Sequence, residues 1–124
     1  MNLNQVTIPV ADVEKSIQFY EVLGLKLIVK SPHYARFECS KGDATFSLHK
    51  VDSLEHNGES AWIYFEVEQL DDFVLQLVDK GIVFDEMPTD KSWLWREARL
   101  KDTDGNRLIL YFAGDNRKNP PWRL

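Results

Sequence analysis

Cysteine, positive charge and long apolar runs are what this 124-residue sequence has little of. Its single cysteine, Cys39, excludes an intrachain disulfide and a cysteine-rich zinc site, so we expect a reducing, cytoplasmic setting. Lys and Arg number 15 against 20 Asp and Glu, and the net charge of −5 argues against a nucleic-acid-binding surface. No stretch approaches the roughly 18 to 20 apolar residues of a membrane-spanning helix. Residues 1–4 lack the basic and apolar parts of a signal peptide.

Several catalytic signatures are also missing. The six glycines are scattered and form no phosphate-binding loop, and the Gly-x-Ser-x-Gly motif of serine nucleophiles is absent. Cys39 has no histidine beside it in sequence, so we interpret it as an inert thiol. What the chain does have is four Trp, four Tyr and seven Phe within a hydrophobic content of 44%. These aromatic residues favour a globular domain with a large core, a ligand pocket, or both.

The first half of the chain predicts a strand, a helix and three further strands. Residues 5–10 alternate between apolar and polar side chains, as a half-buried strand does. Asp12 is suited to cap a helix, and the apolar residues that follow keep helical spacing up to Gly24, a residue typical of helix ends. The three later strands are expected at residues 25–30, 34–39 and 44–50.

The second half repeats this order. A shift of 57 residues carries Val10 onto Val67 and Gly24 onto Gly81, and a shift of 62 residues carries Phe46 onto Leu108. The elements expected there are a strand at 63–67, a helix at 70–81 and strands at 82–84, 93–101 and 107–112. The sequence therefore predicts two tandem β-α-β-β-β modules, because chance does not readily produce matching elements in the same order twice.

The repeat sets the predicted domain organisation. We expect a single α+β domain at residues 1–113, with module one at about 4–51 and module two at about 61–113. A polar, glycine-containing linker at 52–60 joins the modules, and a polar tail follows at 114–124.

Two stretches of sequence resemble one protein family. The first is VADVEKSIQFY at 10–20 with LGL at 23–25, and the second is DTDGN at 102–106 before an apolar strand. They are similar to the start and the closing turn of the glyoxalase/bleomycin-resistance/extradiol-dioxygenase domain, the vicinal oxygen chelate superfamily. The resemblance covers roughly residues 4–113 and is more specific for fold than for reaction. The superfamily includes isomerases, epimerases, dioxygenases, thiol transferases and drug-sequestering proteins.

This resemblance implies that the mixed sheets of the two modules curl into an open cup, with the helices packed outside. It also implies a homodimer, and one divalent metal held by the first and last strands of each module. The four positions that it assigns to metal ligands hold Gln5, Ser47, Trp62 and Ile109. Only Gln5 is a reasonable ligand, because an indole N–H donates hydrogen bonds and an isoleucine side chain has no donor atom.

A slip of two residues in this alignment brings in His49, Glu66 and Tyr111. Gln5, His49 and Glu66 then form a candidate site for Zn, Ni, Mn or Fe, with His49 and Glu66 as candidate catalytic residues. The interpretation that we favour is a pocket with no resident metal or other cofactor.

Strand alternation indicates which side chains face away from the helices. These faces mix aromatic rings with a few polar groups, as a small-molecule pocket does. The candidate ligand-binding residues on them are Gln5, Thr7, Ser47, His49, Trp62, Tyr64 and Tyr111. The segment at 93–99 adds Trp93 and Trp95 as a stacking wall, with Arg96 or Arg99 as an anchor for an acidic group. The same segment also suits two core tryptophans and a surface ion pair.

Three functions remain open at the level of sequence. The first is a homodimeric binding protein that holds a small aromatic or anionic molecule without the usual metal. The second is a divalent-metal-dependent lyase, isomerase or dioxygenase of the same superfamily. The third is an interaction dimer that binds no ligand. We expect neither nucleic acid nor membrane as a partner.

Overall fold

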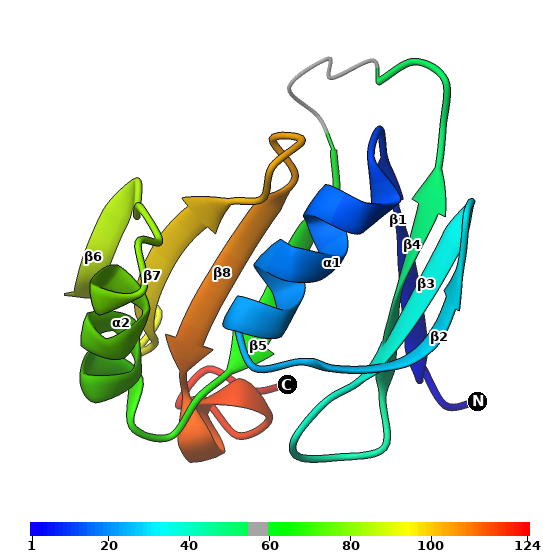
Figure 1. Cartoon of the computed structure of the whole chain (residues 1–124). Coiled ribbons are helices and arrows are strands. Elements are labelled where there is room, and N and C mark those ends of the chain that lie inside the picture. Colours follow the sequence, from blue (N-terminus) through cyan, green and yellow to red (C-terminus); the bar gives the residue numbers. More distant parts are fainter. Residues whose placement is uncertain (55–59) are drawn as a thin grey trace. The chain divides into compact units, whose positions relative to one another are not determined.

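The computed structural model describes residues 1–54 and 60–124 and divides into two compact units (Figure 1). The first unit comprises Met1–Glu59 and Asp102–Asn106, and the second comprises Ser60–Lys101 and Arg107–Leu124. Most of the linker predicted at 52–60 falls on residues 55–59, outside the described residues. Each unit holds one β-α-β-β-β module, so the predicted α+β class and the internal repeat are confirmed.

The first unit contains one helix and a four-stranded mixed sheet. Its strand order is β1-β4-β3-β2; β1 is parallel to β4 and the other neighbours are antiparallel. In chain order the elements are β1 (Gln5–Val10), α1 (Val13–Val22), β2 (Lys26–Ser31), β3 (Tyr34–Glu38) and β4 (Thr45–Lys50).

The second unit repeats this topology with the strand order β5-β8-β7-β6. Both ends of α2 match those of α1 at the shift that carries Gly24 onto Gly81, and both ends of β8 match those of β4 at the shift that carries Phe46 onto Leu108. The elements are β5 (Trp62–Glu66), α2 (Leu70–Asp79), β6 (Glu86–Asp90), β7 (Arg96–Lys101), β8 (Arg107–Phe112) and a short 3₁₀ helix, η1 (Gly114–Arg117).

The predicted helix start and helix ends are confirmed. The backbone N–H of Lys15 donates to Asp12 Oδ1 at 3.0 Å, so Asp12 caps α1. Gly24 and Gly81 have φ of +99° and +92°, left-handed values that favour glycine. After Gly81, the N–H of Ile82 donates to the carbonyl of Leu77 at 3.0 Å and closes the last turn of α2.

The strand predicted at 82–84 is wrong, and β6 lies at Glu86–Asp90 instead. Residues 82–84 connect α2 to β6. The backbone hydrogen bonds to β7 begin at Asp85, whose N–H donates to the carbonyl of Arg99 at 2.8 Å. Pro88 within β6 made this segment look like a loop, but an outer strand tolerates a proline. The strand predicted at 93–101 also begins later, because residues 91–95 form the β6–β7 turn.

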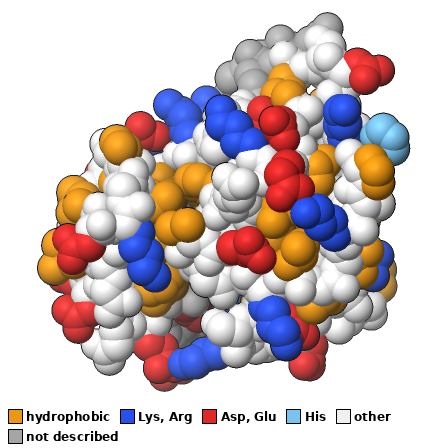
Figure 2. All heavy atoms as spheres, in the orientation of Figure 1, with side chains coloured by type: hydrophobic (Ala, Val, Ile, Leu, Met, Phe, Trp, Pro, Cys, Tyr) orange, Lys and Arg blue, Asp and Glu red, His pale blue; other side chains and the backbone are white. Residues whose placement is uncertain are grey.

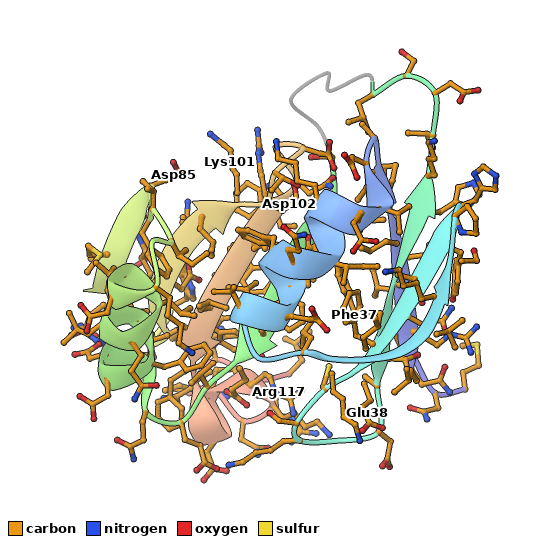
Figure 3. The ribbon with its side chains drawn as sticks, in the orientation of Figure 1. Phe37, Glu38, Asp85, Lys101, Asp102 and Arg117 are labelled. Carbon is orange, nitrogen blue, oxygen red and sulfur yellow. The ribbon has the colours of Figure 1, made fainter. Side chains whose placement is uncertain are left out.

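The core of the first unit lies between α1 and its sheet. Tyr20 of α1 is fully buried, with ring centroids 4.8 Å from Phe46 and 6.0 Å from Phe37. Phe37 points from β3 toward the helix (Figure 3). Burying one such large apolar side chain stabilises a fold by roughly 1.5–3 kcal/mol, so this aromatic group is a major part of the unit's stability.

Asp102 is a second, polar centre of the first unit, beside α1 (Figure 3). Its carboxylate accepts the Tyr20 hydroxyl at 2.6 Å, the backbone N–H groups of Asp104 and Asn106, and the side-chain amide of Asn106. The same amide of Asn106 also donates to the carbonyl of Pro9 at 3.1 Å. Burial, and then the charge of Asp102, raise the pKa of Tyr20 far above its ordinary value, so this hydroxyl keeps its proton.

The surface carries both signs of charge side by side. On the face shown in Figure 2, Lys and Arg side chains alternate with Asp and Glu side chains. Lys101 and Asp85, for example, lie 3.6 Å apart at one end of the second sheet (Figure 3). Among the described residues, neither α1 nor α2 is long and apolar enough to cross a membrane.

We predict that Tyr20→Phe destabilises the protein by about 1.5–3 kcal/mol, because it removes a buried hydrogen bond to a carboxylate. Urea unfolding followed by far-ultraviolet circular dichroism measures the change. The matched control is Tyr64→Phe, which should change the free energy of unfolding by less than about 0.5 kcal/mol because Tyr64 is partly exposed. Equal unfolding midpoints for Tyr20→Phe and the native protein would contradict this role of Asp102.

Candidate functional site

Each helix covers one face of its sheet, so strand alternation sends every second side chain to the opposite face. We call the face opposite α1 the polar face and the face opposite α2 the aromatic face. The polar face carries Gln5, Thr7, Tyr34, Arg36, Thr45, Ser47 and His49. The aromatic face carries Trp62, Tyr64, Glu66, Trp95, Glu97, Arg99, Arg107, Ile109 and Tyr111.

A cluster of three rings forms the centre of the aromatic face. Trp95 stacks on Tyr111 with ring centroids 4.7 Å apart, and Tyr64 meets both rings edge-on at 5.9 and 5.5 Å. Tyr111 is buried with Ile109, whereas Tyr64 is 40% exposed. The cluster is therefore anchored in the unit at one end and open at the other.

Trp62 lies on the same face under two positive charges. The guanidinium carbons of Arg99 and Arg107 are 5.4 and 5.5 Å from its ring centroid, within the range of cation–π attraction. Trp62 remains 45% exposed. An exposed ring with two adjacent cations suits a flat, negatively charged molecule.

A buried carboxylate fixes this arrangement. Glu97 is fully buried and accepts the indole N–H of Trp93 at 2.9 Å and a guanidinium N–H of Arg99 at 3.1 Å. Arg99 also approaches Glu86, with Nε 3.6 Å from a carboxylate oxygen. Among the residues that the structure describes, this buried Nε–H has no hydrogen-bond acceptor.

Arg96, the other predicted anchor, is not brought together with these residues. It pairs with Phe112 in the register and projects to the α2 side, where it donates two hydrogen bonds to Asp71 and one to Asp90. These hydrogen bonds raise the pKa of Arg96 and lower that of Asp71. An arginine with two carboxylate partners has little left to offer an acidic ligand.

The polar face brings together Gln5, Thr7, Ser47 and His49, as the alternation predicts. Two residues of β3 join them: Arg36 Nε donates to the Tyr34 hydroxyl at 2.9 Å, and that hydroxyl donates to Ser47 Oγ at 2.8 Å. Ser47 is fully buried, while His49 is exposed.

Tyr34 has an unusual acidity for this chain. Burial acts to raise its pKa, but hydrogen bonds with Ser47 and Arg36 and the Arg36 charge outweigh burial, so the pKa lies below its ordinary value of 10.0. The other three tyrosines, Tyr20, Tyr64 and Tyr111, have raised pKa values, in each case chiefly through burial.

The residues at the family's metal positions do not fit a divalent ion. Trp62 and Ile109 offer no lone pair, and Ser47 Oγ is occupied by Tyr34. Two of the three alternative ligands are also engaged: Gln5 Oε1 accepts from Thr45 at 3.0 Å, and Glu66 accepts the N–H groups of residues 113 and 114. Within residues 1–54 and 60–124, no group of three or more His, Cys, Asp or Glu side chains is arranged to hold a metal.

A cavity of about 690 Å³ lies elsewhere in the first unit, on the helix side of the sheet. It is lined by the start of α1, the end of β2 and Lys50. Its lining charges largely cancel, since Lys30 pairs with Glu14 at 2.7 Å. We place candidate sites on the polar face and on the aromatic face, each taken by itself, because guanidinium groups stand there beside aromatic rings.

Tyr34, Arg36, Glu97 and Arg107 belong to these faces but were not among the predicted site residues. The signal for the first two was the alternation of polar residues at 34, 36 and 38. Glu97 stands between Trp95 and Arg99 on one strand face, but its complete burial depends on packing that the sequence does not show.

The comparisons with known proteins identify the family. The model of the Glyoxalase/Bleomycin resistance protein/Dioxygenase superfamily matches residues 2–110, and the chain belongs to this superfamily, as its motifs predicted. The uncharacterized protein YraH of Bacillus subtilis (strain 168) is 30% identical over 127 residues, which cover 90% of this chain and 98% of that protein.

Two further similarities are informative. The trivalent organoarsenical cleaving enzyme of Bacillus sp. (strain MD1) is 28% identical over 138 residues, covering 98% of this chain and 81% of the enzyme. The crystal structure of a bleomycin-binding protein complexed with bleomycin has a TM-score of 0.72 at 20% identity, covering 90% of this chain and 98% of that chain. The second likeness shows the fold alone.

We predict that Tyr34 is the first tyrosine to ionise as the pH rises. Ultraviolet difference spectroscopy should show one early phenolate step that is absent in Tyr34→Phe. Arg36→Gln removes the cation that stabilises the phenolate, so the pKa of Tyr34 should rise and the early step should move to higher pH. An early step unchanged in Arg36→Gln would show that the Arg36–Tyr34 contact does not exist in solution.

Proposed function

We propose that this protein binds a small aromatic molecule with an acidic group on its aromatic face, without a resident metal. The observation that carries the proposal is Trp62, a half-exposed ring under two guanidinium groups and on the same face as a three-ring cluster. Arg99, whose side chain is 33% exposed, and Arg107 supply positive charge beside this ring for the acidic group.

The chemistry of the face supports this assignment. Ring stacking gives affinity with little demand on ligand identity, and arginine adds a preference for a planar anion. A family member of similar fold, the bleomycin-binding protein, is named for the binding of a small molecule. Glu97 has a positioning role in the proposal, because it holds both Trp93 and Arg99.

Isothermal titration with 2-naphthoate tests the proposal. We expect saturable binding that weakens about tenfold in Trp62→Ala, since one aromatic contact is lost. Replacing the carboxylate by an amide, as in 2-naphthamide, should weaken binding to the native protein, and Arg99→Gln should remove this preference.

The matched control is Trp122→Ala, which removes an exposed tryptophan of the C-terminal tail. Its affinity for 2-naphthoate should equal that of the native protein. The proposal fails if 2-naphthoate does not bind, or if Trp62→Ala and Trp122→Ala bind it equally well.

A lyase activity is the alternative, and the similarity to the organoarsenical-cleaving enzyme favours it. Trivalent arsenic prefers soft thiolate ligands, and this chain has one cysteine, the half-buried Cys39, whose pKa is raised by burial. A single thiol with a raised pKa is a poor starting point for the same chemistry.

A thermal-shift assay separates the two functions. We expect micromolar Ni²⁺, Zn²⁺, Mn²⁺ or Fe²⁺ to leave the melting temperature unchanged, and exhaustive chelation to leave 2-naphthoate binding intact. A metal-induced stabilisation that disappears in Gln5→Ala or His49→Ala would instead support a metal enzyme with Gln5, His49 and Glu66 as ligands.

Gln5, Thr7, Ser47 and His49, the remaining predicted ligand contacts, lie on the polar face of the first unit and are no part of this binding site. The homodimer, the cytoplasmic location and the division into a single domain with a tail stay predictions.

A further inference from the structure

Arg36 sits at the centre of a network on the polar face of the first unit. In the sheet register it lies between Val29 of β2 and Ser47 of β4. Its Nε–H is held by the Tyr34 hydroxyl at 2.9 Å, and its guanidinium carbon lies 5.4 Å from the Tyr34 ring centroid. The fully buried Ser47 accepts the Tyr34 hydroxyl at 2.8 Å and completes the chain of contacts. A guanidinium held at Nε and against a ring has a fixed orientation.

The charge of Arg36 is not neutralised in the described part of the chain. Glu38, the carboxylate two residues along the same strand face, is instead paired with Lys26 at 3.0 Å. Within residues 1–54 and 60–124, Arg36 has no carboxylate within ion-pair distance, and its two terminal nitrogens donate no hydrogen bond. Arg36 is half-buried, so these donors are partly withdrawn from bulk water.

Arg36 lies beside two positions that the family's enzymes use to hold a metal. The resemblance assigns Gln5 and Ser47 to two positions that hold a metal in the family's enzymes, and Ser47 pairs directly with Arg36 in the register. In this unit, Ser47 Oγ accepts the Tyr34 hydroxyl and Gln5 Oε1 accepts the Thr45 hydroxyl. Arg36 therefore supplies a positive charge on the strand face that carries these two positions.

We propose that Arg36, held in place by Tyr34 and Ser47, is an anion site of the first unit that binds a carboxylate through the two terminal guanidinium nitrogens. The planar fork of these nitrogens matches the two oxygens of a carboxylate. Tyr34 and Ser47 are positioning residues, since they act through Arg36. The site lies on the polar face and is independent of the proposed binding on the aromatic face.

Acetate is the probe, with acetamide as its uncharged counterpart at constant ionic strength. The ¹⁵N-labelled full chain gives separate arginine Nε–H signals, so Arg96, which is bound to Asp71 and Asp90, and the tail residue Arg123 serve as references in the same spectra. We expect acetate to shift the Arg36 signal saturably and at lower concentration than the signals of Arg96 and Arg123. Acetamide should leave the Arg36 signal unchanged.

Variants distinguish the effect of the planar guanidinium of Arg36 from the effect of its positive charge. Arg36→Lys keeps the charge but loses the fork, so acetate affinity, measured from the backbone amide signals around Ser47, should fall about tenfold. Tyr34→Phe should weaken binding several-fold and move the Arg36 Nε–H signal even without acetate, a change that loss of bulk stability would not produce. Lys50→Gln, which removes one positive charge from the helix side of the sheet, should bind acetate as the native protein does.

An Arg36 signal that responds to acetate no more strongly than those of Arg96 and Arg123 overturns the proposal. So does an Arg36→Lys variant with native affinity. Because acetate has no ring, either failure leaves the 2-naphthoate result on the aromatic face unaffected, and the two proposals fail separately.

Discussion

One constraint governs this protein: each module has a single helix, and that helix covers only one face of a four-stranded sheet. Apolar side chains must therefore gather on the helix side, and strand alternation sends the remaining side chains to the other face. Tyr20 and Phe37 in the first unit show the first consequence, and the row of Tyr34, Arg36 and Ser47 shows the second. The core and the candidate site are two sides of the same strands.

The repeat gives both units one topology but not one chemistry. In the first unit the face opposite the helix is hydrogen-bonded and holds an unpaired guanidinium, as far as the described residues show. In the second, the corresponding face holds Trp62, Tyr64 and Tyr111, and its buried charge, Glu97, is matched by Arg99. The fold supplies equivalent positions, and substitution at those positions decides what they recognise.

Much of the fold follows from the sequence because periodicity and capping are local signals. Asp12, Gly24 and Gly81 marked helix limits, and the two shifts placed α2 and β8 correctly. β6 was misplaced because an apolar run after α2 looked more strand-like than an outer strand with a proline.

The strand faces that carry the candidate site were predictable from alternation, but the hydrogen-bond and ion-pair partners of their side chains were not. The sequence does not show that Arg96 turns toward Asp71, nor that Glu97 is buried between Trp93 and Arg99.

Electrostatics limit how such a protein holds an acid. Its net charge of −5 repels anions at a distance, although physiological salt screens that repulsion beyond about 8 Å. Recognition must therefore come from contacts at hydrogen-bonding range, where arginine forks act on a ligand that is already close. This favours fixed guanidinium groups over mobile lysines, because a fixed fork loses little entropy on binding. The ring of Tyr34 beside Arg36 and that of Trp62 beside Arg99 provide that fixation in the two units by the same cation–π contact.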